Sequence, residues 1–265
     1  MKRATRIIIR GAIVVLALAV LGVVAFLFWA VNPLGPGEQA REALVSRGDV
    51  GVRETRESWL LFGLENTDSG ILEGGTGVVF YPGGRVDYRS YAPLARKIAR
   101  EGFGVVLVPA PLNLMVFASG RAQEVFDRFP GVDRWVIAGH SLGAAMATNF
   151  VRQNTGLVSN GTIHAMVLLA GYPADGWDLS RLSLPVLSLV AEFDEVFNRE
   201  TFEATRTLLP PDTVFSTIAG GNHAGFGDYG PQPGDGIATV RPHMQQQIAA
   251  DEIVRFLRSL DERRP

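Results

Sequence analysis

The 265-residue chain contains no cysteine. Disulfide bonds, thiolate metal sites and cysteine nucleophiles are therefore excluded together. Lysine is nearly absent as well, since Lys2 and Lys97 are the only two, and no Gly-x-x-x-x-Gly-Lys phosphate-binding loop occurs. Charge of neither sign is in excess, because 25 Lys and Arg stand against 27 Asp and Glu for a formal net charge of -2. The composition therefore excludes a P-loop nucleotide hydrolase and argues against nucleic-acid binding.

Signatures of bound cofactors are missing too. No Gly-x-Gly-x-x-Gly stands directly after a predicted strand, which argues against the usual dinucleotide site. The four histidines are dispersed and lack the His-x-x-x-His spacing of a zinc site. We therefore expect neither a metal ion nor an organic cofactor.

The N-terminus carries one long uncharged run. Residues 11–31 contain no charged side chain, and 21 helical residues at about 1.5 Å each span a hydrocarbon core of roughly 30 Å. Trp29 stands near the end of the run, where an aromatic side chain suits the membrane interface. Four basic residues precede the run: Lys2, Arg3, Arg6 and Arg10.

This pattern predicts a single-pass anchor in the cell membrane. The basic flank is expected to stay in the cytoplasm, which places the rest of the chain outside it. A cleaved signal peptide is the alternative, although its apolar region is usually about 7 to 15 residues and ends in small residues. We divide the chain into a basic flank and anchor (1–31), a linker (32–48) and a folded domain (49–265).

After the linker, short apolar runs alternate with stretches of helical spacing. This alternation predicts an α/β fold with a mostly parallel central sheet and helices on both faces. The strands are expected at 50–56, 59–64, 77–81, 105–108, 135–138, 165–169, 186–190 and 214–218. The helices are expected at 91–100, 118–129, 142–153, 199–208 and 244–260.

A candidate nucleophile stands at the end of one predicted strand. The segment Gly139-His140-Ser141-Leu142-Gly143 separates strand 135–138 from helix 142–153. A Gly-x-Ser-x-Gly in this position makes a turn so sharp that side chains at 139 and 143 would collide with their neighbours, and the serine is pushed toward solvent. A glycine turn whose serine merely caps the helix is the alternative.

A serine nucleophile needs a base and an acid that orients the base. His223 is the predicted base, because it lies in a glycine-rich loop directly after strand 214–218. Asp194 follows strand 186–190 and gives the chain order Ser141, Asp194, His223. Glu192 remains the alternative acid.

The negative oxygen of a tetrahedral intermediate needs backbone N–H donors. Leu142, directly after the serine, is expected to supply one. The second is expected from the glycine-rich turn after strand 77–81, with Gly84 preferred and Gly83 and Arg85 as alternatives.

These motifs together resemble the α/β-hydrolase superfamily, and in particular small bacterial serine hydrolases with little or no cap. The resemblance covers most of the chain from residue 50 onward, and three further segments carry it beside the Gly-His-Ser-Leu-Gly turn: Phe80-Tyr81-Pro82-Gly83-Gly84, Asp194 after its strand, and Gly220-Gly221-Asn222-His223. It implies a serine esterase that cleaves carboxylic esters or related acyl bonds of small molecules through an acyl-enzyme, without metal or cofactor. Two alternatives stay open: an acyltransferase on the same triad, and a catalytically silent hydrolase fold that acts as a binding module.

Overall fold

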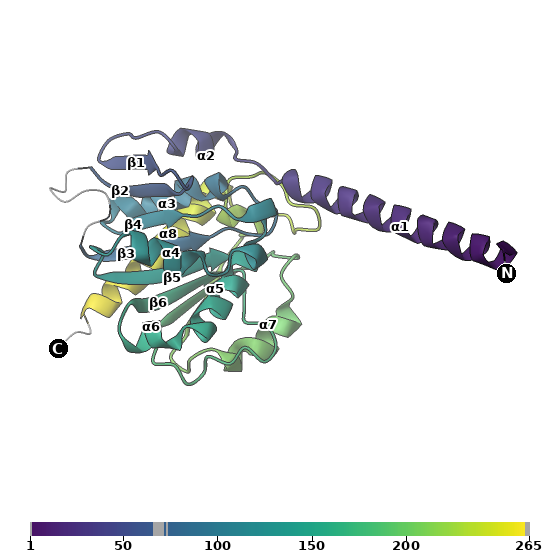
Figure 1. Ribbon diagram of the computed structural model, residues 1–265. Coiled ribbons are helices and arrows are strands. Elements are labelled where there is room, and N and C mark those ends of the chain that lie inside the picture. The colour runs from purple at the N-terminus through teal and green to yellow at the C-terminus, as the bar shows by residue number, and fades with distance from the viewer. Residues whose placement is uncertain (1, 66–71, 73, 263–265) are drawn as a thin grey trace.

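The computed structural model describes residues 2–65, 72 and 74–262, and it describes the side chains of these residues except 2–8 and 261. In this part of the chain an eight-stranded sheet has the order β1-β2-β4-β3-β5-β6-β7-β8 (Figure 1). The strands are β1 (Val50–Glu54), β2 (Leu60–Leu64), β3 (Thr76–Tyr81), β4 (Gly104–Leu107), β5 (Arg134–His140), β6 (Ile163–Leu169), β7 (Val186–Ala191) and β8 (Val214–Ile218). The α-helices are α1 (Lys2–Val31), α2 (Glu38–Ala43), α3 (Ala92–Arg100), α4 (Arg121–Arg128), α5 (Leu142–Gln153), α6 (Thr155–Ser159), α7 (Arg199–Thr205) and α8 (Pro242–Glu262).

The sheet is parallel except at one side. β1 pairs with β2, and β2 with β4, in antiparallel fashion, whereas the pairs from β4 through β3, β5, β6 and β7 to β8 are parallel. The central strands are buried along almost their whole length, as expected for a sheet covered on both faces. The predicted α/β architecture is confirmed.

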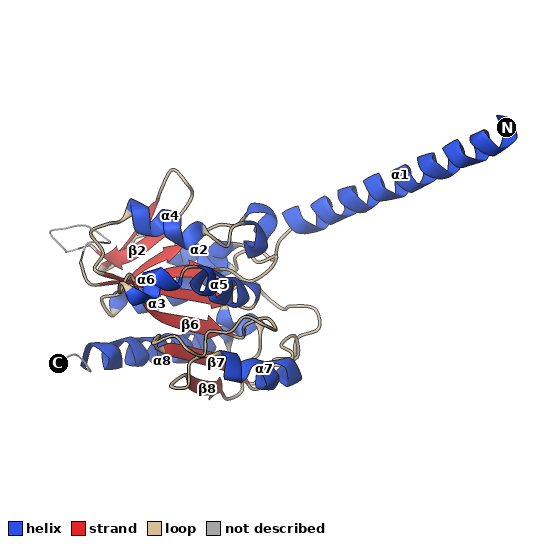
Figure 2. Cartoon of the chain, turned by 60° about the horizontal axis from the view of Figure 1, so that its bottom comes forward, coloured by secondary structure: helices blue, strands red, loops and turns tan. Residues whose placement is uncertain are grey.

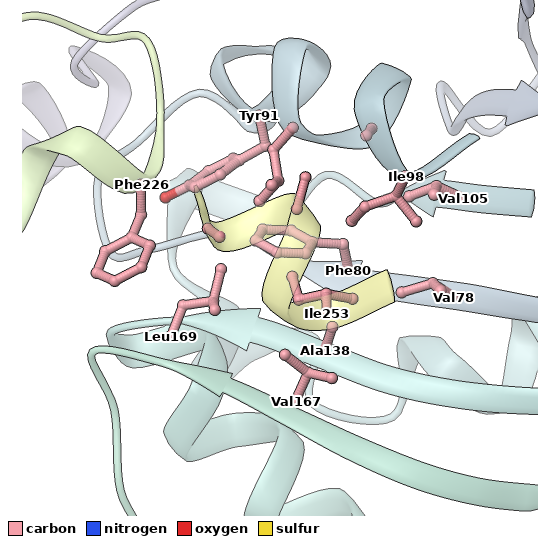
Figure 3. Packing of buried hydrophobic residues seen from close by; sticks show 14 of the residues in the cluster. Val78, Phe80, Tyr91, Ile98, Val105, Ala138, Val167, Leu169, Phe226 and Ile253 are labelled. Carbon is pink, nitrogen blue, oxygen red and sulfur yellow. The ribbon is translucent and has the colours of Figure 1, made fainter. Parts of the chain in front are cut away.

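Alternate residues of each central strand enter separate cores on the two faces of the sheet. Val78 and Phe80 of β3 pack in the core beneath α3 and α8, together with Ile98 and Ile253 (Figure 3). Val79 and Tyr81 face the other core, which α4 and α5 cover. This alternation follows from the two-residue period of a strand. Because the central strands are parallel, their carboxyl ends lie at one common edge of the sheet.

The observed elements differ from the expected ones mainly at their ends. The helix expected at 118–129 begins at Arg121, because residues 115–117 form a separate 3-10 turn. The last helix begins two residues earlier than expected, at Pro242, where a proline suits the first helical turn. The short helix α6 was not expected, since its Thr, Gly and Ser residues are poor helix formers.

The segment interpreted as a linker, 32–48, is hydrogen-bonded to the domain along part of its length. The N–H of Leu34 donates to the carbonyl of Arg85 at 2.8 Å, and the N–H of Gly37 donates to the carbonyl of Asp228 at 2.6 Å. Helix α2 then buries Ala40 and Ala43. The segment therefore fixes the end of α1 against the domain, while α1 itself projects away from it (Figures 1 and 2).

One buried arginine holds the chain between α2 and β1. The guanidinium of Arg96 on α3 donates to the carbonyls of Ala43, Val45, Arg47 and Val50. Arg96 is only 8% exposed, and its bonds to the carbonyls of Ala43 and Val50 are buried, so water has little access to these two carbonyls.

We expect Arg96→Met to lower the free energy of unfolding by roughly 2 kcal/mol, because it leaves the buried carbonyl of Ala43 without its donor and removes the bonds to Val45 and Arg47. Urea unfolding of the full chain in detergent micelles measures this. The matched control is Arg100→Met on the exposed side of the same helix, which we expect to change stability by less than about 0.5 kcal/mol. Equal losses in the two variants would contradict the role assigned to Arg96.

Candidate active site

Ser141 occupies a strained turn between β5 and α5. Its backbone dihedrals are φ 54° and ψ -120°, outside the regions that a side-chain-bearing residue ordinarily adopts. Glycine is required on both sides: a Cβ at Gly139 would lie 2.5 Å from the carbonyl carbon of Gly143, and a Cβ at Gly143 would overlap the carbonyl oxygen of Tyr81. The chain thus accepts strain at one serine, which is the arrangement of a nucleophile elbow.

His223 and Asp194 form a buried pair. The Nδ1 of His223 lies 2.7 Å from Oδ2 of Asp194, and the two side chains are 2% and 0% exposed. The other oxygen of Asp194 accepts the N–H groups of Phe197 at 2.8 Å and Val196 at 3.1 Å. With Nδ1–H donating to the carboxylate, Nε2 of His223 is left as the basic nitrogen.

The alternative acid, Glu192, lies elsewhere. Its carboxylate accepts the backbone N–H of Gly220 at 2.8 Å, and the residue is exposed. Of the two carboxylates weighed from the sequence, the fold therefore brings Asp194 to the histidine.

Ser141 and His223 line one pocket of about 260 Å³. The pocket lies at the carboxyl edge of the sheet, between the start of α5 and the loops that follow β6 and β7. Its remaining lining residues are Leu142, Ala145, Ala170, Gly171, Tyr172, Val196, Phe197 and Asn198. A small molecule in this pocket would meet the serine and the histidine together.

The turn after β3 has one free backbone donor among its three candidates. The N–H of Gly83 donates to the hydroxyl of Tyr91 at 3.0 Å, and the N–H of Arg85 donates to the carbonyl of Asn113 at 2.8 Å. The N–H of Gly84 donates to no acceptor in the described part of the chain. A Cβ at Gly84 would lie 3.1 Å from Cδ2 of Leu142, so the two predicted donor residues are neighbours.

Leu142 is the first residue of α5, and an N–H in the first turn of a helix has no acceptor within the helix. Leu142 and Gly84 are therefore neighbouring residues whose N–H groups are available to a ligand. Such a pair suits the oxyanion of a tetrahedral intermediate.

Tyr91 and His140 connect the turn after β3 with His223, a link that no local pattern in the sequence marks. The Tyr91 hydroxyl, which accepts from Gly83, lies 2.8 Å from Nδ1 of His140. The His140 ring lies 4.5 Å, between centroids, from the ring of His223. Tyr91 and His140 are 49 positions apart, so only the tertiary fold brings them together.

Burial holds both of these side chains in their neutral forms. Loss of hydration raises the pKa of Tyr91. Loss of hydration, and secondly the neighbouring His223, hold the pKa of His140 well below 6.5. The Tyr91 hydroxyl can therefore donate to an unprotonated Nδ1 of His140.

Asp235 is a further residue whose contact with the histidine loop was not predicted from the sequence. Its carboxylate accepts the backbone N–H groups of His223 at 3.1 Å and Ala224 at 2.8 Å. It thus fixes the backbone that carries the histidine. No local signal marks this role, because an aspartate among glycines and prolines is also typical of a turn.

No group of three or more His, Cys, Asp or Glu side chains that could hold a metal ion occurs among the described residues.

The covered parallel sheet and the strand-turn-helix around Ser141 define an α/β-hydrolase fold. Residues 77–247 match the model of the alpha/beta hydrolase family, so the chain belongs to that family. None of the curated proteins matches the sequence significantly.

Solved structures agree on the fold. An esterase from the fungus Rhizomucor miehei is similar with a TM-score of 0.57 and 18% identity, over 84% of this chain and 86% of that one. Dienelactone hydrolase from Anabaena variabilis is similar with a TM-score of 0.56 and 13% identity, over 80% of this chain and 99% of that one.

The buried, neutral His140 makes the free energy of unfolding decrease as the pH falls. Below about pH 6.5 the unfolded chain binds a proton on this histidine that the folded chain does not, so stability falls as the pH falls. We expect His140→Asn, which keeps an acceptor for Tyr91 but does not titrate, to lose about 2 kcal/mol less between pH 7 and pH 5 than the parent. Urea unfolding at both pH values tests this, and equal losses in the two proteins would contradict a neutral His140.

Proposed function

We propose that this protein is a serine hydrolase that cleaves carboxylic esters through an acyl-enzyme intermediate. The observation that carries the proposal is the buried pair of His223 and Asp194, with His223 lining the same pocket as Ser141. A histidine oriented by a carboxylate, in one pocket with a strained serine, is the arrangement that activates a hydroxyl.

In the first half of the reaction, the Oγ of Ser141 attacks the ester carbonyl and its proton passes to Nε2 of His223. Asp194 stabilises the resulting imidazolium through Nδ1–H. The carbonyl oxygen becomes negative and accepts from the N–H groups of Leu142 and Gly84. As the carbonyl re-forms, the C–O bond to the alcohol breaks, and His223 returns the proton to the leaving alkoxide.

In the second half, water attacks the acyl group on Ser141 and gives its proton to His223. The tetrahedral intermediate uses the same two N–H donors. Its collapse breaks the bond to Oγ, releases the carboxylic acid and returns the proton to Ser141. The cycle uses no metal or cofactor, because each proton and electron pair is accounted for by the three side chains and water.

Two observations favour an ester as the substrate. The fungal structure with the same fold is described as an esterase. The pocket walls include Leu142, Tyr172 and Phe197, which suit the apolar part of an acyl or alcohol group better than a charged one.

We further propose that 1–31 anchor the protein in the cell membrane, that 32–48 connect the anchor to the catalytic domain, and that this domain, 49–265, lies outside the cytoplasm. The span Ile9–Val31 is 23 residues long with a mean hydropathy of 2.9. None of its most apolar window is buried against the domain, which argues against a helix of the protein core.

The orientation predicts that alkaline phosphatase fused after Pro265 is active in cells, because that enzyme requires export for activity. A cytoplasmic reporter fused at the same position serves as the control. An inactive phosphatase with an active cytoplasmic reporter would contradict the proposed orientation.

The catalytic proposal predicts that a fluorophosphonate labels the full chain at Ser141, as located by mass mapping. We expect Ser141→Ala to abolish labelling and to lower ester turnover on the order of 10⁶-fold, and His223→Ala to lower both strongly. Ser183→Ala, at a serine before the amino end of β7 and away from the pocket, is the matched control and should label normally. A folded parent that is not labelled would contradict an activated serine and favour the binding-module alternative.

A further inference from the structure

We propose that the catalytic edge of this domain lies on the bilayer surface and that the enzyme takes an amphiphilic, long-chain ester from the lipid phase. The inference rests on the proposed esterase function for the substrate. The docking surface rests on separate observations: how the end of α1 is attached, and where exposed apolar side chains gather.

The end of α1 is bound to the oxyanion turn itself. Arg85, next to Gly84, donates from Nε to the carbonyl of Trp29 and from Nη2 to the carbonyl of Asn32, both at 2.9 Å. The same guanidinium lies 4.3 Å over the Trp29 ring. The candidate span ends at Val31, so no free chain separates its last apolar turn from the active-site edge.

A second loop at the same edge holds the helix as well. The side-chain amide of Asn113, in the loop after β4, donates to the carbonyl of Ala30 at 3.0 Å, and Ala30 is fully buried. The N–H of Asp87 donates to the carbonyl of Leu34 at 2.9 Å, just beyond the helix. Contacts on both sides of Val31 leave the domain little freedom to turn away from the plane in which α1 ends.

Exposed apolar side chains gather at this edge. Outside α1, eight large apolar residues are exposed in the described part of the chain. Three of them lie elsewhere: Val45 before β1, Val214 at the amino end of β8, and Met244 in α8. The other five stand in loops that follow the carboxyl ends of β4, β7 and β8, and we call them the apolar rim: Val116, Phe117, Phe193, Val196 and Ile237.

The rim borders the reactive groups on two sides. Val116 and Phe117 follow Leu114, which lies close to Gly84, since a Cβ on that glycine would be 3.8 Å from Cδ2 of Leu114. On the other side, Val196 lines the pocket of Ser141. Phe193 and Ile237 are adjacent too, because a Cβ at Gly236 would overlap the carbonyl oxygen of Phe193.

These features point to lipid as the occupant. A bilayer that contains α1 begins where the helix ends, and the helix ends against the turn after β3 and the loop after β4, which bears Val116 and Phe117. Phe117 is 55% exposed and Ile237 is 90% exposed, which is costly in water and favourable in the acyl boundary of a membrane. An ester whose chain lies in the bilayer would reach Ser141 past Val196 without first dissolving in water.

The absence of cysteine allows a direct test of the docking surface. Phe117→Cys and Ile237→Cys, each labelled with an environment-sensitive fluorophore in the full chain, are reconstituted in phosphatidylcholine vesicles containing nitroxide-labelled lipid. We expect strong quenching and a blue-shifted emission at both sites. Val214→Cys, exposed at the amino end of β8, is the matched control and should show neither. Phe117 and Ile237 signals equal to that of Val214 would overturn the docking surface, whatever the outcome for catalysis.

The substrate is tested by a ratio of two activities in the same vesicles. The parent is given a diacylglycerol held in the bilayer and a short-chain, water-soluble p-nitrophenyl ester. We expect the double variant F117D/I237D to lower the ratio of bilayer to soluble hydrolysis about tenfold. Ser141→Ala removes both activities and measures the background.

The outcomes separate the two proposals. An unchanged ratio in F117D/I237D, with both esters hydrolysed, would overturn the lipid-phase substrate while leaving the esterase function standing. Hydrolysis of neither ester by the parent would overturn the esterase function and the substrate together, and the quenching result would still decide the docking surface. A melting temperature of the double variant close to that of the parent excludes misfolding as the cause of a changed ratio.

Discussion

The contact of Gly143 with the carbonyl of Tyr81 is the constraint on which the site depends. It lets α5 begin directly beside the end of β3, and this closeness places Leu142 next to Gly84. Any side chain at 143 would push the helix away from the strand, and the two N–H donors would separate. The positive φ of Ser141 follows from the same closeness, since the chain must reverse within one residue to enter the helix.

Hydrogen bonds and a ring contact then connect the turn after β3 with His223. From Gly83 a hydrogen bond reaches Tyr91, and from Tyr91 another reaches His140, whose ring packs on His223. Burial keeps the pKa of His140 low and that of Tyr91 high, so no charge change disturbs this series near neutral pH. His223 is thus held by Asp194 on one side and by the ring of the neutral His140 on the other.

The N-terminal helix enters the same arrangement through Arg85. Arg85, in the turn after β3, contacts the backbone at the end of α1 and the ring of Trp29. Because Arg85 joins α1 to the turn after β3, the position of the helix is fixed relative to the loops around Ser141. The proposed membrane orientation therefore also bears on the proposed substrate. Loops at strand ends carry function in this fold because the rigid sheet positions them.

Local patterns in the sequence determined the α/β class, most strand and helix positions, the glycine-flanked serine and the long apolar run, because each depends on neighbours within about ten residues. The order Ser141, Asp194, His223 could be predicted because each residue follows a strand, and parallel strands end at one edge. Only the tertiary structure showed that Asp194, and not Glu192, contacts His223, and that of the N–H groups of Gly83, Gly84 and Arg85 only that of Gly84 has no acceptor among the described residues. Only it joined Tyr91 to His140 and Arg85 to α1, because contacts between residues far apart in the chain depend on how the layers pack, which no local pattern records.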